Sequence, residues 1–544
     1  MSNPTVVIKS GRVEGIQQEN VSVFKSIPYA KAPVGDLRWR PPQPVGPWTG
    51  TFKADKFGPM AMQRGAEMME FLNNLMAGQG MGKLKIWFFK NMIKYGPRPA
   101  QSEDSLHLTV RSPNLDNSAK LPVMVWIHGG AHQDGSSVEP FYDGNALPER
   151  GVVTVTINYR LGLLGFMSHP ELSAESEHGV SGNYGMLDQI AALEWVQQNI
   201  EQFGGDPDNV TIFGESAGGE SVLHLMCSPL ARGLFHKAIP QSAATGAQYV
   251  HLKKPFGTFP SAEAQGEAFM TRAGAKSISD LRKMSAQELQ KVVQAGHFEE
   301  GNFYPVIDGW SLPKSIPQTF IDGDQANVPL LIGTNGDEST LFASIMESPL
   351  MEYAQVPNPT SGLPDYMQAE FGDDLNRVVE LYPGLENCEP KAAVDLQGDT
   401  FFGAPTRLYA GEHSQNAPTY LYHFRRTSPL PGQTGGAFHA GELAFVHGTS
   451  SPIVHFTEAD QPLADTMQTY WTNFAKTSDP NGSSLPQWST FDDSNPSWMT
   501  FNTGDVRERP IELEEQYQIF MRRIGRKLDM MRELESPTEA IPAD

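Results

Sequence analysis

One serine in the chain lies in a setting that would make it a nucleophile. Ser216 is the central residue of the run at 214–218 (GESAG), which follows a β-branched run at 210–213 and precedes a helical stretch at 220–225. Glycines at both ends of the run permit a sharp turn from strand to helix, and such a turn exposes the serine hydroxyl. The pattern occurs once in the sequence, and its alternative is a structural Gly/Ser turn.

A serine hydroxyl at neutral pH needs a base to take its proton and an acid to orient that base. Asp337 and Glu338 follow a strand-like run at 330–332, so either one could be the acid, although an acidic solvated turn is the ordinary alternative. The histidines beyond that loop are His413, His423, His439, His447 and His455. His439 ranks first because it joins a glycine-rich loop to an expected helix, whereas His423 lies in a strand-like run typical of a structural histidine.

Acyl transfer also needs donors for a tetrahedral oxyanion, and the turn at 128–132 (HGGAH) follows a predicted strand at 123–127. Small residues there let backbone N–H groups approach a carbonyl oxygen, and the N–H of Ala217 would complete a set worth roughly 3–4 kcal/mol per donor. The sequence contains no His-Glu-x-x-His motif and no Walker A loop. No metal and no other cofactor is therefore expected.

The elements that must position these residues alternate between strands and helices. A helical pattern at 186–196 lies between two of the predicted buried strands, and strand, helix, strand is the unit of a parallel sheet. The strands are expected at 123–127, 152–157, 210–213 and 330–332. We therefore predict an α/β fold with a large, mostly parallel central sheet flanked by helices.

Length and composition set the class of protein. Hydrophobic residues make up 39% and charged residues 19% of the 544 residues, as in a soluble globular protein, and no apolar run is long enough to span a membrane. Lys and Arg total 41 against 63 Asp and Glu, so the net charge of −22 argues against a nucleic-acid partner and mildly favours neutral or cationic substrates. The start resembles no secretory signal, so a cytoplasmic location is expected, and only Cys227 and Cys388 could form a bridge.

Length alone suggests three or four domains, but the candidate site residues between 216 and 439 must converge on one pocket. We therefore predict a single domain over residues 1–544. Residues 60–100 form a Met-rich excursion that would pack on the body, act as a lid or gorge wall, or lie at a lipid interface. Helical spacing at 511–534 predicts a C-terminal helix that docks on the body or joins a second copy; the chain is expected to be a monomer or homodimer.

Motifs along residues 5–505 together resemble the type-B carboxylesterase/lipase family of α/β-hydrolases, in particular its bacterial para-nitrobenzyl-esterase-like branch. These motifs lie at 27–38, 102–106, 128–131, 158–162, 182–189, 203–207, 214–219, 333–338 and 474–481. The resemblance implies an α/β-hydrolase fold and a serine carboxylesterase that acts on small-molecule esters through an acyl-enzyme.

The resemblance also assigns the roles that the residues alone leave open. It implies Ser216, Glu338 and His439 as the catalytic triad. The backbone N–H groups of Gly130, Ala131 and Ala217 fall on the family's oxyanion hole. Ser242 falls on a serine that hydrogen-bonds near the acid and the base, and Glu215 is counted with it as a supporting residue.

Secreted relatives carry a disulfide whose two cysteines fall on Ala61 and Ser105. The absence of both cysteines from this sequence agrees with a reducing compartment. A lipase or an amidase with the same triad is the first alternative function. A non-catalytic, cholinesterase-like binding protein is a second, disfavoured because no triad residue is lost. Neither the physiological ester nor its acyl and alcohol chain lengths follow from the sequence.

Overall fold

A computed structural model provides the structure of the chain. It describes residues 3–63, 75–95, 99–245, 250–256, 260–295, 303–341, 367–368, 370–387, 389–449 and 454–535.

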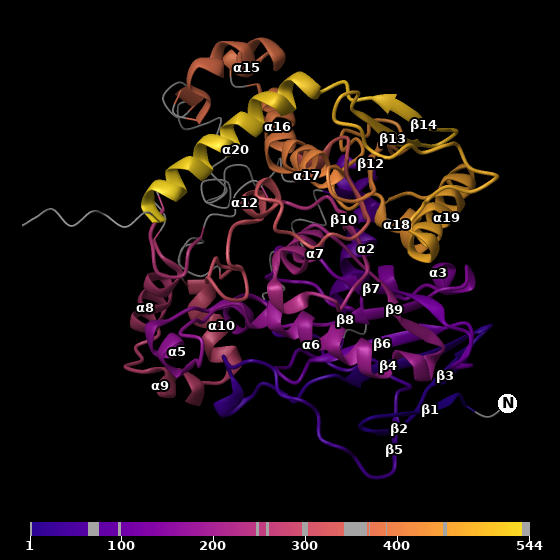
Figure 1. Ribbon diagram of the computed structural model, residues 1–544, viewed down its shortest axis with the longest axis vertical. Coiled ribbons are helices and arrows are strands. Elements are labelled where there is room, and N and C mark those ends of the chain that lie inside the picture. The colour runs from indigo at the N-terminus through magenta and orange to yellow at the C-terminus, as the bar shows by residue number, and fades with distance from the viewer. Residues whose placement is uncertain are drawn as a thin grey trace, which may run out of the picture.

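A mixed sheet of eleven strands forms the centre of the molecule (Figure 1), in the order β14-β13-β12-β11-β10-β9-β7-β8-β6-β4-β3. The strands from β13 to β8 run parallel, and the pairs at both edges are antiparallel. The bounds are β3 Ile16–Gln18, β4 Val21–Pro28, β6 His107–Ser112, β7 Leu121–Ile127, β8 Val153–Ile157, β9 Gly205–Glu215, β10 Lys237–Gln241, β11 Leu330–Asn335, β12 Thr419–Phe424, β13 Ser497–Asn502 and β14 Asp505–Pro510. A small separate sheet holds β1 Thr5–Ile8, β2 Gly11–Glu14 and β5 Thr51–Lys53. The α/β-hydrolase architecture expected from the sequence is confirmed.

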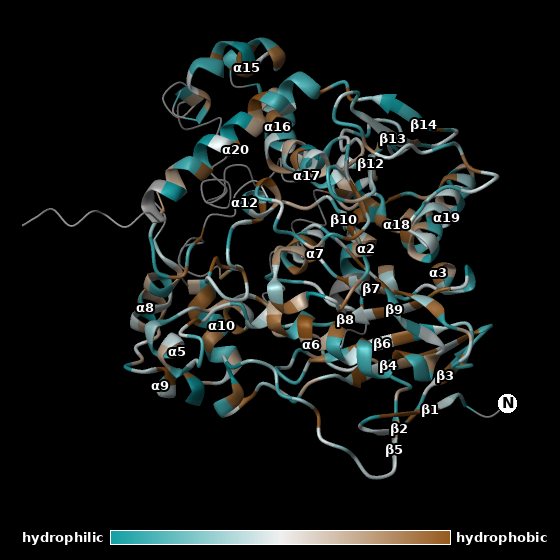
Figure 2. Ribbon diagram, in the orientation of Figure 1, coloured by the Kyte–Doolittle hydropathy of each residue, from teal (hydrophilic) through white to brown (hydrophobic). Residues whose placement is uncertain are grey.

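Alternation along the strands divides the core between the two faces of this sheet. Along β7, Val123, Val125 and Ile127 belong to one buried cluster, whereas Met124 and Trp126 belong to another. Successive side chains of a strand point to opposite faces, so each face is covered by its own helices. Helices α6 Tyr184–Asn199, α7 Ala217–Cys227, α17 Ala404–Ser414 and α20 Glu514–Glu535 contribute to the first cluster, and α18 Leu443–His447 and α19 Gln461–Thr477 to the second. Figure 2 shows hydrophobic residues along the central strands and hydrophilic ones on the edge strand β14.

The predicted strands and the helix at 186–196 all form, with some differences in extent. β9 begins at Gly205 rather than at residue 210, because Gly205 pairs with Leu121 of β7. The strands β8 and β9, which flank α6 in the sequence, are not neighbours, since β7 lies between them in the sheet. Both nonetheless run parallel to β7, so their carboxyl ends meet at one edge of the sheet.

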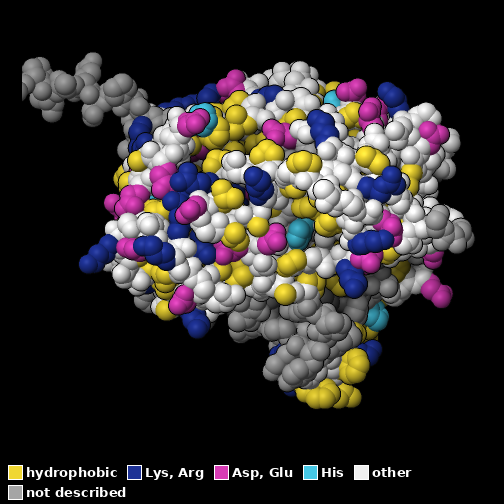
Figure 3. Space-filling model, turned by 90° about the horizontal axis from the view of Figure 1, so that it is seen from below, with side chains coloured by type: hydrophobic (Ala, Val, Ile, Leu, Met, Phe, Trp, Pro, Cys, Tyr) yellow, Lys and Arg dark blue, Asp and Glu magenta, His cyan; other side chains and the backbone are white. Residues whose placement is uncertain are grey.

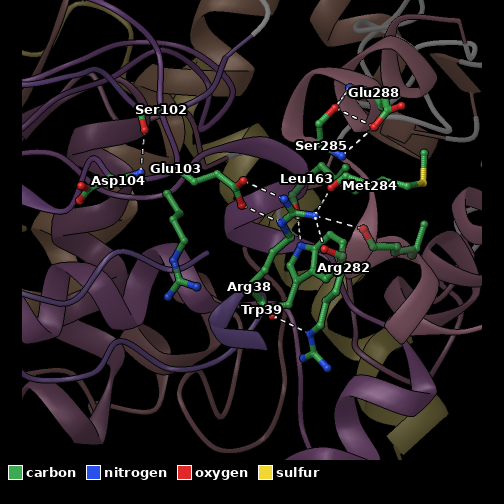
Figure 4. A network of polar contacts seen from close by, with 12 residues as sticks. Arg38, Trp39, Ser102, Glu103, Asp104, Leu163, Arg282, Met284, Ser285 and Glu288 are labelled. Carbon is green, nitrogen blue, oxygen red and sulfur yellow. Dashed lines mark hydrogen bonds and ion pairs between the residues drawn. The ribbon is translucent and has the colours of Figure 1, made fainter. Parts of the chain in front are cut away.

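Arg38 fixes the N-terminal part to the body and forms a largely buried ion pair with Glu103 (Figure 4). Both carboxylate oxygens of Glu103 accept hydrogen bonds from Arg38, each at 2.7 Å, and Arg38 also donates to the carbonyl of Met284 at 2.8 Å. Ala61 and Ser105, where secreted relatives would carry a disulfide, line a small cavity together with this pair. The charge pair therefore holds this segment without a covalent link.

Three further expectations concern particular segments. In the 60–100 excursion, helix α2 Lys83–Tyr95 is described, but Met68 and Met69 lie outside the described residues. The C-terminal helix α20 buries Tyr517, Phe520 and Leu528 against the body. Cys227 is buried as a free thiol in α7, and Cys388 lies outside the described residues. Among the helices in the described ranges, none has the length and apolar character needed to cross a bilayer.

Candidate active site

Ser216 lies between the end of β9 and the first residue of α7, the position that its sequence motif predicts. Its φ of 58° and ψ of −126° lie outside the regions that L-residues ordinarily occupy. Such a conformation costs of order 1–3 kcal/mol and persists only where the surroundings enforce it. The Ser216 N–H donates to the carbonyl of Gln241 at 2.9 Å, and the Ser216 carbonyl accepts from the Glu220 N–H at 2.8 Å. The turn holds a half-buried serine at the carboxyl edge of the sheet.

Two glycines allow the nucleophile turn to approach β7 closely. A Cβ built on Gly218 would lie 2.1 Å from the carbonyl oxygen of Ile127, which no larger residue could tolerate. A Cβ on Gly129 would lie 2.6 Å from the carbonyl oxygen of Glu215 and 3.1 Å from Cβ of Ser216. The glycine-rich loop after β7 is therefore pressed directly against the serine.

That loop has the geometry expected of an oxyanion hole. Gly130, Ala131 and His132 all have positive φ, at 108°, 53° and 56°. The carbonyl of Gly130 accepts from the N–H groups of Gln133 and Asp134, both at 2.9 Å. Within the described part of the chain, the N–H groups of Gly130, Ala131 and Ala217 donate to no acceptor. These amides are thus available to a ligand beside Ser216.

The ring of His132 anchors the same loop to α7. Its Nε2 lies 3.1 Å from Oε2 of Glu220, and both side chains are buried. Burial lowers the pKa of His132 to about 3 and raises that of Glu220 to about 7, so the pair is not an ion pair at neutral pH or below. The sequence analysis did not identify this contact, because the two residues lie 88 positions apart.

The two candidate acids have different partners in the structure. Glu338 is buried at the start of a short 3₁₀ turn after β11, where Oε2 lies 2.6 Å from Nδ1 of His439 and Oε1 accepts the Asn335 N–H at 2.7 Å. Asp337 instead accepts the N–H of Ala437 at 2.8 Å and forms a β-bridge to Phe438. Asp337 holds the loop in place, and Glu338 faces the imidazole.

His439 is surrounded by carboxylates. Its Nε2 lies 3.1 Å from Oε1 of Glu215, the residue before Ser216, on the side opposite Glu338. Burial alone would lower the pKa of His439, but the negative charges of Glu215 and Glu338 outweigh it and raise that pKa above its usual value. Burial and the neighbouring carboxylates also raise the pKa of Glu215. The site stabilises an imidazolium between two acidic groups.

A buried polar network beneath the site escaped the sequence analysis. Glu442 accepts hydrogen bonds from Nδ2 of Asn335 at 2.7 Å and from Nε2 of Gln241 at 3.0 Å. Asn335 Nδ2 also donates to the carbonyl of Phe438 at 2.9 Å, next to His439. Glu442 lies three residues after His439, about one helical turn. That spacing was the only feature of the sequence that could have indicated that Glu442 lies near the site. The network joins the ends of β10 and β11 to the histidine loop.

The other downstream histidines have structural surroundings. His423 stacks on Trp498 with ring centroids 4.0 Å apart, and His447 packs edge-on against Trp126 at 4.5 Å. His413 lies in α17, and His455 lies beside α2. The hydroxyl of Ser242 is buried and makes no hydrogen bond within the described residues, while its N–H donates to the carbonyl of Gly333 at 2.9 Å. In the described ranges, no cluster of His, Cys, Asp and Glu could hold a metal ion.

Comparisons with known proteins agree on one family. Residues 2–520 match the family described as "Carboxylesterase family". The chain is 35% identical to the fumonisin B1 esterase of Sphingopyxis macrogoltabida over 89% of this chain and 84% of that protein. It is 33% identical to the para-nitrobenzyl esterase of Bacillus subtilis over 96% of this chain and 99% of that protein.

Solved structures give the same result. A para-nitrobenzyl esterase superposes with a TM-score of 0.76 at 30% identity, covering 95% of this chain and 100% of that one. A carboxylesterase of Geobacillus stearothermophilus superposes with a TM-score of 0.76 at 32% identity, covering 95% and 99%. With the family match and the shared fold, the chain belongs to the carboxylesterase family and is a carboxylic ester hydrolase.

Proposed function

We propose that the protein hydrolyses small-molecule carboxylic esters through a covalent acyl-enzyme on Ser216. The observation that carries this proposal is the buried hydrogen bond of 2.6 Å between His439 Nδ1 and Glu338 Oε2, on the loop that faces the nucleophile turn. This bond fixes the ring so that Nε2 is the nitrogen that exchanges protons.

The reaction takes place in two halves. Ser216 Oγ attacks the ester carbonyl carbon while His439 Nε2 takes the hydroxyl proton, and the tetrahedral oxyanion accepts hydrogen bonds from the N–H groups of Gly130, Ala131 and Ala217. The C–O bond to the alcohol then breaks, and His439 returns the proton to the leaving oxygen. A water molecule attacks the acyl-enzyme by the same route, releasing the acid and regenerating Ser216.

The surrounding acids support these proton transfers. Glu338 orients His439 and, together with Glu215, stabilises the positive charge that the ring carries in each tetrahedral intermediate. Asp337 and Glu442 hold the loop that delivers the ring. Because His439 can protonate the leaving group, the same residues would also hydrolyse an activated amide, although more slowly than an ester.

Ser216→Ala tests the proposal, with Ser489→Ala as an exposed control serine far along the chain. The Ser216 variant should lose at least about a thousandfold in kcat on a short-chain aryl ester. A pre-steady-state burst of alcohol, equal to one per enzyme, should appear in the parent protein and in the control but not in Ser216→Ala. Turnover that survives in a folded Ser216 variant would refute the assignment.

A further inference from the structure

Helix α2 presents large hydrophobic side chains to solvent. Leu84, Trp87 and Phe88 are 80%, 63% and 59% exposed, and they form an i, i+3, i+4 stripe on the helix. Seven large hydrophobic residues are exposed in the described ranges, and three of them belong to this stripe. Contiguous exposed apolar groups on a soluble protein mark a surface that something else covers.

The opposite side of α2 is packed, so the stripe is not the consequence of a loosely placed helix. Ile86 joins Met76 and Met81 in a buried cluster, with Phe89 and Leu430 packed against it. The helix thus has an inner apolar side and a separate outer one.

The turn before α2 is also attached to the body by hydrogen bonds. The carbonyl of Gly78 accepts the N–H groups of Thr434 and Gly435 at 2.7 and 2.9 Å, and the Gln79 carbonyl accepts the Ser428 hydroxyl at 3.1 Å. Figure 3 shows hydrophobic side chains at the tip of a projection from the body, at the horizontal position that α2 has in Figure 1.

The charge along α2 is positive, although the protein as a whole is acidic. Lys83, Lys85 and Lys90 are on the described part of α2, and residues 71–102 contain no Asp or Glu in a chain of net charge −22. In the described ranges, none of these lysines forms an ion pair. A hollow lined by Met81, Phe88, Phe89 and His455 adjoins the stripe.

We propose that α2 docks the enzyme on an anionic lipid surface. Leu84, Trp87 and Phe88 would enter the boundary between headgroups and acyl chains, and Lys83, Lys85 and Lys90 would contact anionic headgroups. A helix that combines Trp, Phe and Leu on one side with lysines beside them has the composition of an interfacial helix. Repulsion between the acidic body and the membrane is screened beyond about 8 Å at physiological salt.

Sedimentation of the full-length protein with lipid vesicles tests this surface independently of ester hydrolysis. The probes are vesicles of phosphatidylcholine alone and vesicles that also contain phosphatidylglycerol, at physiological salt. The protein should partition to the anionic vesicles and at least tenfold more weakly to the neutral ones, because each lysine near an anionic surface strengthens binding about fivefold.

Two triple variants separate the apolar contribution from the charged one. L84S/W87S/F88S should lose at least tenfold in partitioning to both kinds of vesicle, and K83Q/K85Q/K90Q should lose the preference for phosphatidylglycerol. The double variant V7S/M530S is the matched control, because Val7 and Met530 are exposed hydrophobic residues in other elements. Thermal unfolding monitored by circular dichroism establishes that each variant is folded.

The proposal is overturned if the parent protein binds neither kind of vesicle, if it binds both equally, or if L84S/W87S/F88S binds as the parent does. Analytical ultracentrifugation tests whether a second copy of the chain, rather than lipid, covers the stripe. If the parent is a dimer that this variant converts to a monomer, a second copy of the chain covers the stripe and the lipid assignment is wrong.

Discussion

His132 and Glu220 form a buried contact, 3.1 Å between Nε2 and Oε2, that joins the proposed oxyanion loop to the helix after Ser216. His132 directly follows Ala131, and Glu220 lies four residues after Ser216, so the contact helps to fix the distance between the proposed oxyanion donors and the proposed nucleophile. The loop is also held by the Gly162 N–H, which donates to the His132 carbonyl at 2.7 Å. Oxyanion donors stabilise a transition state only when they are already placed before the charge develops.

Replacement of Glu220 should therefore reduce kcat more when the new side chain offers His132 no hydrogen-bonding partner. Glu220→Gln keeps a polar partner for His132 Nε2, since an amide can both donate and accept, and should retain kcat within about threefold, whereas Glu220→Leu should lose at least about tenfold because the loop is no longer fixed. Steady-state kcat on a short-chain aryl ester checks this, with thermal unfolding as the control for folding. Equal kcat values for the two variants would show that the contact is not used for positioning.

The same residue should make stability depend on pH. Burial raises the pKa of Glu220 to about 7 in the folded protein, so the folded state holds a proton that the unfolded state releases near its ordinary value. Its contribution to stability is present at low pH and is lost as the pH rises toward 7. The free energy of unfolding of Glu220→Gln, relative to that of the parent, should therefore increase between pH 5 and pH 8. Denaturant unfolding at several pH values measures it, and a pH-independent difference would contradict the prediction.

Glu215 should set the acid limb of the pH profile. Its carboxylate beside Nε2 raises the pKa of His439, and His439 must be neutral to accept the Ser216 proton. Glu215→Gln should move the acid limb of kcat/KM to lower pH, and it should also lower the plateau because the imidazolium loses one counter-charge.

Glu442→Gln is the matched control, since Glu442 contributes least to that raised pKa and its carboxylate is bonded to Asn335 and Gln241. Its acid limb should shift less than that of Glu215→Gln. Complete pH profiles of kcat/KM for the three proteins make the comparison, and an unmoved acid limb in Glu215→Gln would be inconsistent with the geometry.

The adjacent acids should differ sharply in their effect on catalysis. Glu338→Gln should lower kcat by roughly 10⁴, as removal of the orienting carboxylate does in comparable triads. Asp337→Ala should change kcat by less than tenfold and cost about 1 kcal/mol of stability, because it removes one hydrogen bond to the Ala437 N–H. Steady-state kcat and denaturant unfolding of both variants test this prediction. If Asp337→Ala lost far more activity than Glu338→Gln, Asp337 would be the orienting acid instead.

Local patterns in the sequence were sufficient to predict the strands and the turn at Ser216, and they ranked His439 first among the downstream histidines. They left Asp337 and Glu338 open, because the choice depends on the β-bridge from Asp337 to Phe438, which lies about 100 residues away in the chain. Glu442 and Glu220 were missed for the same reason, since their partners Gln241 and His132 become neighbours only through the fold. Periodicity and motifs report on adjacent residues, whereas burial and pairing of polar groups depend on the assembled sheet.

The hydrogen bonds from Thr434 and Gly435 to the Gly78 carbonyl have a mechanical consequence. They attach the turn before α2 to a segment of chain that reaches His439 four residues after Gly435. A tilt of α2 would either break these two bonds or displace residues 434–435, which precede the proposed catalytic base His439. A partner on the outer side of α2 would therefore contact a helix whose preceding turn is hydrogen-bonded to the segment that leads to His439.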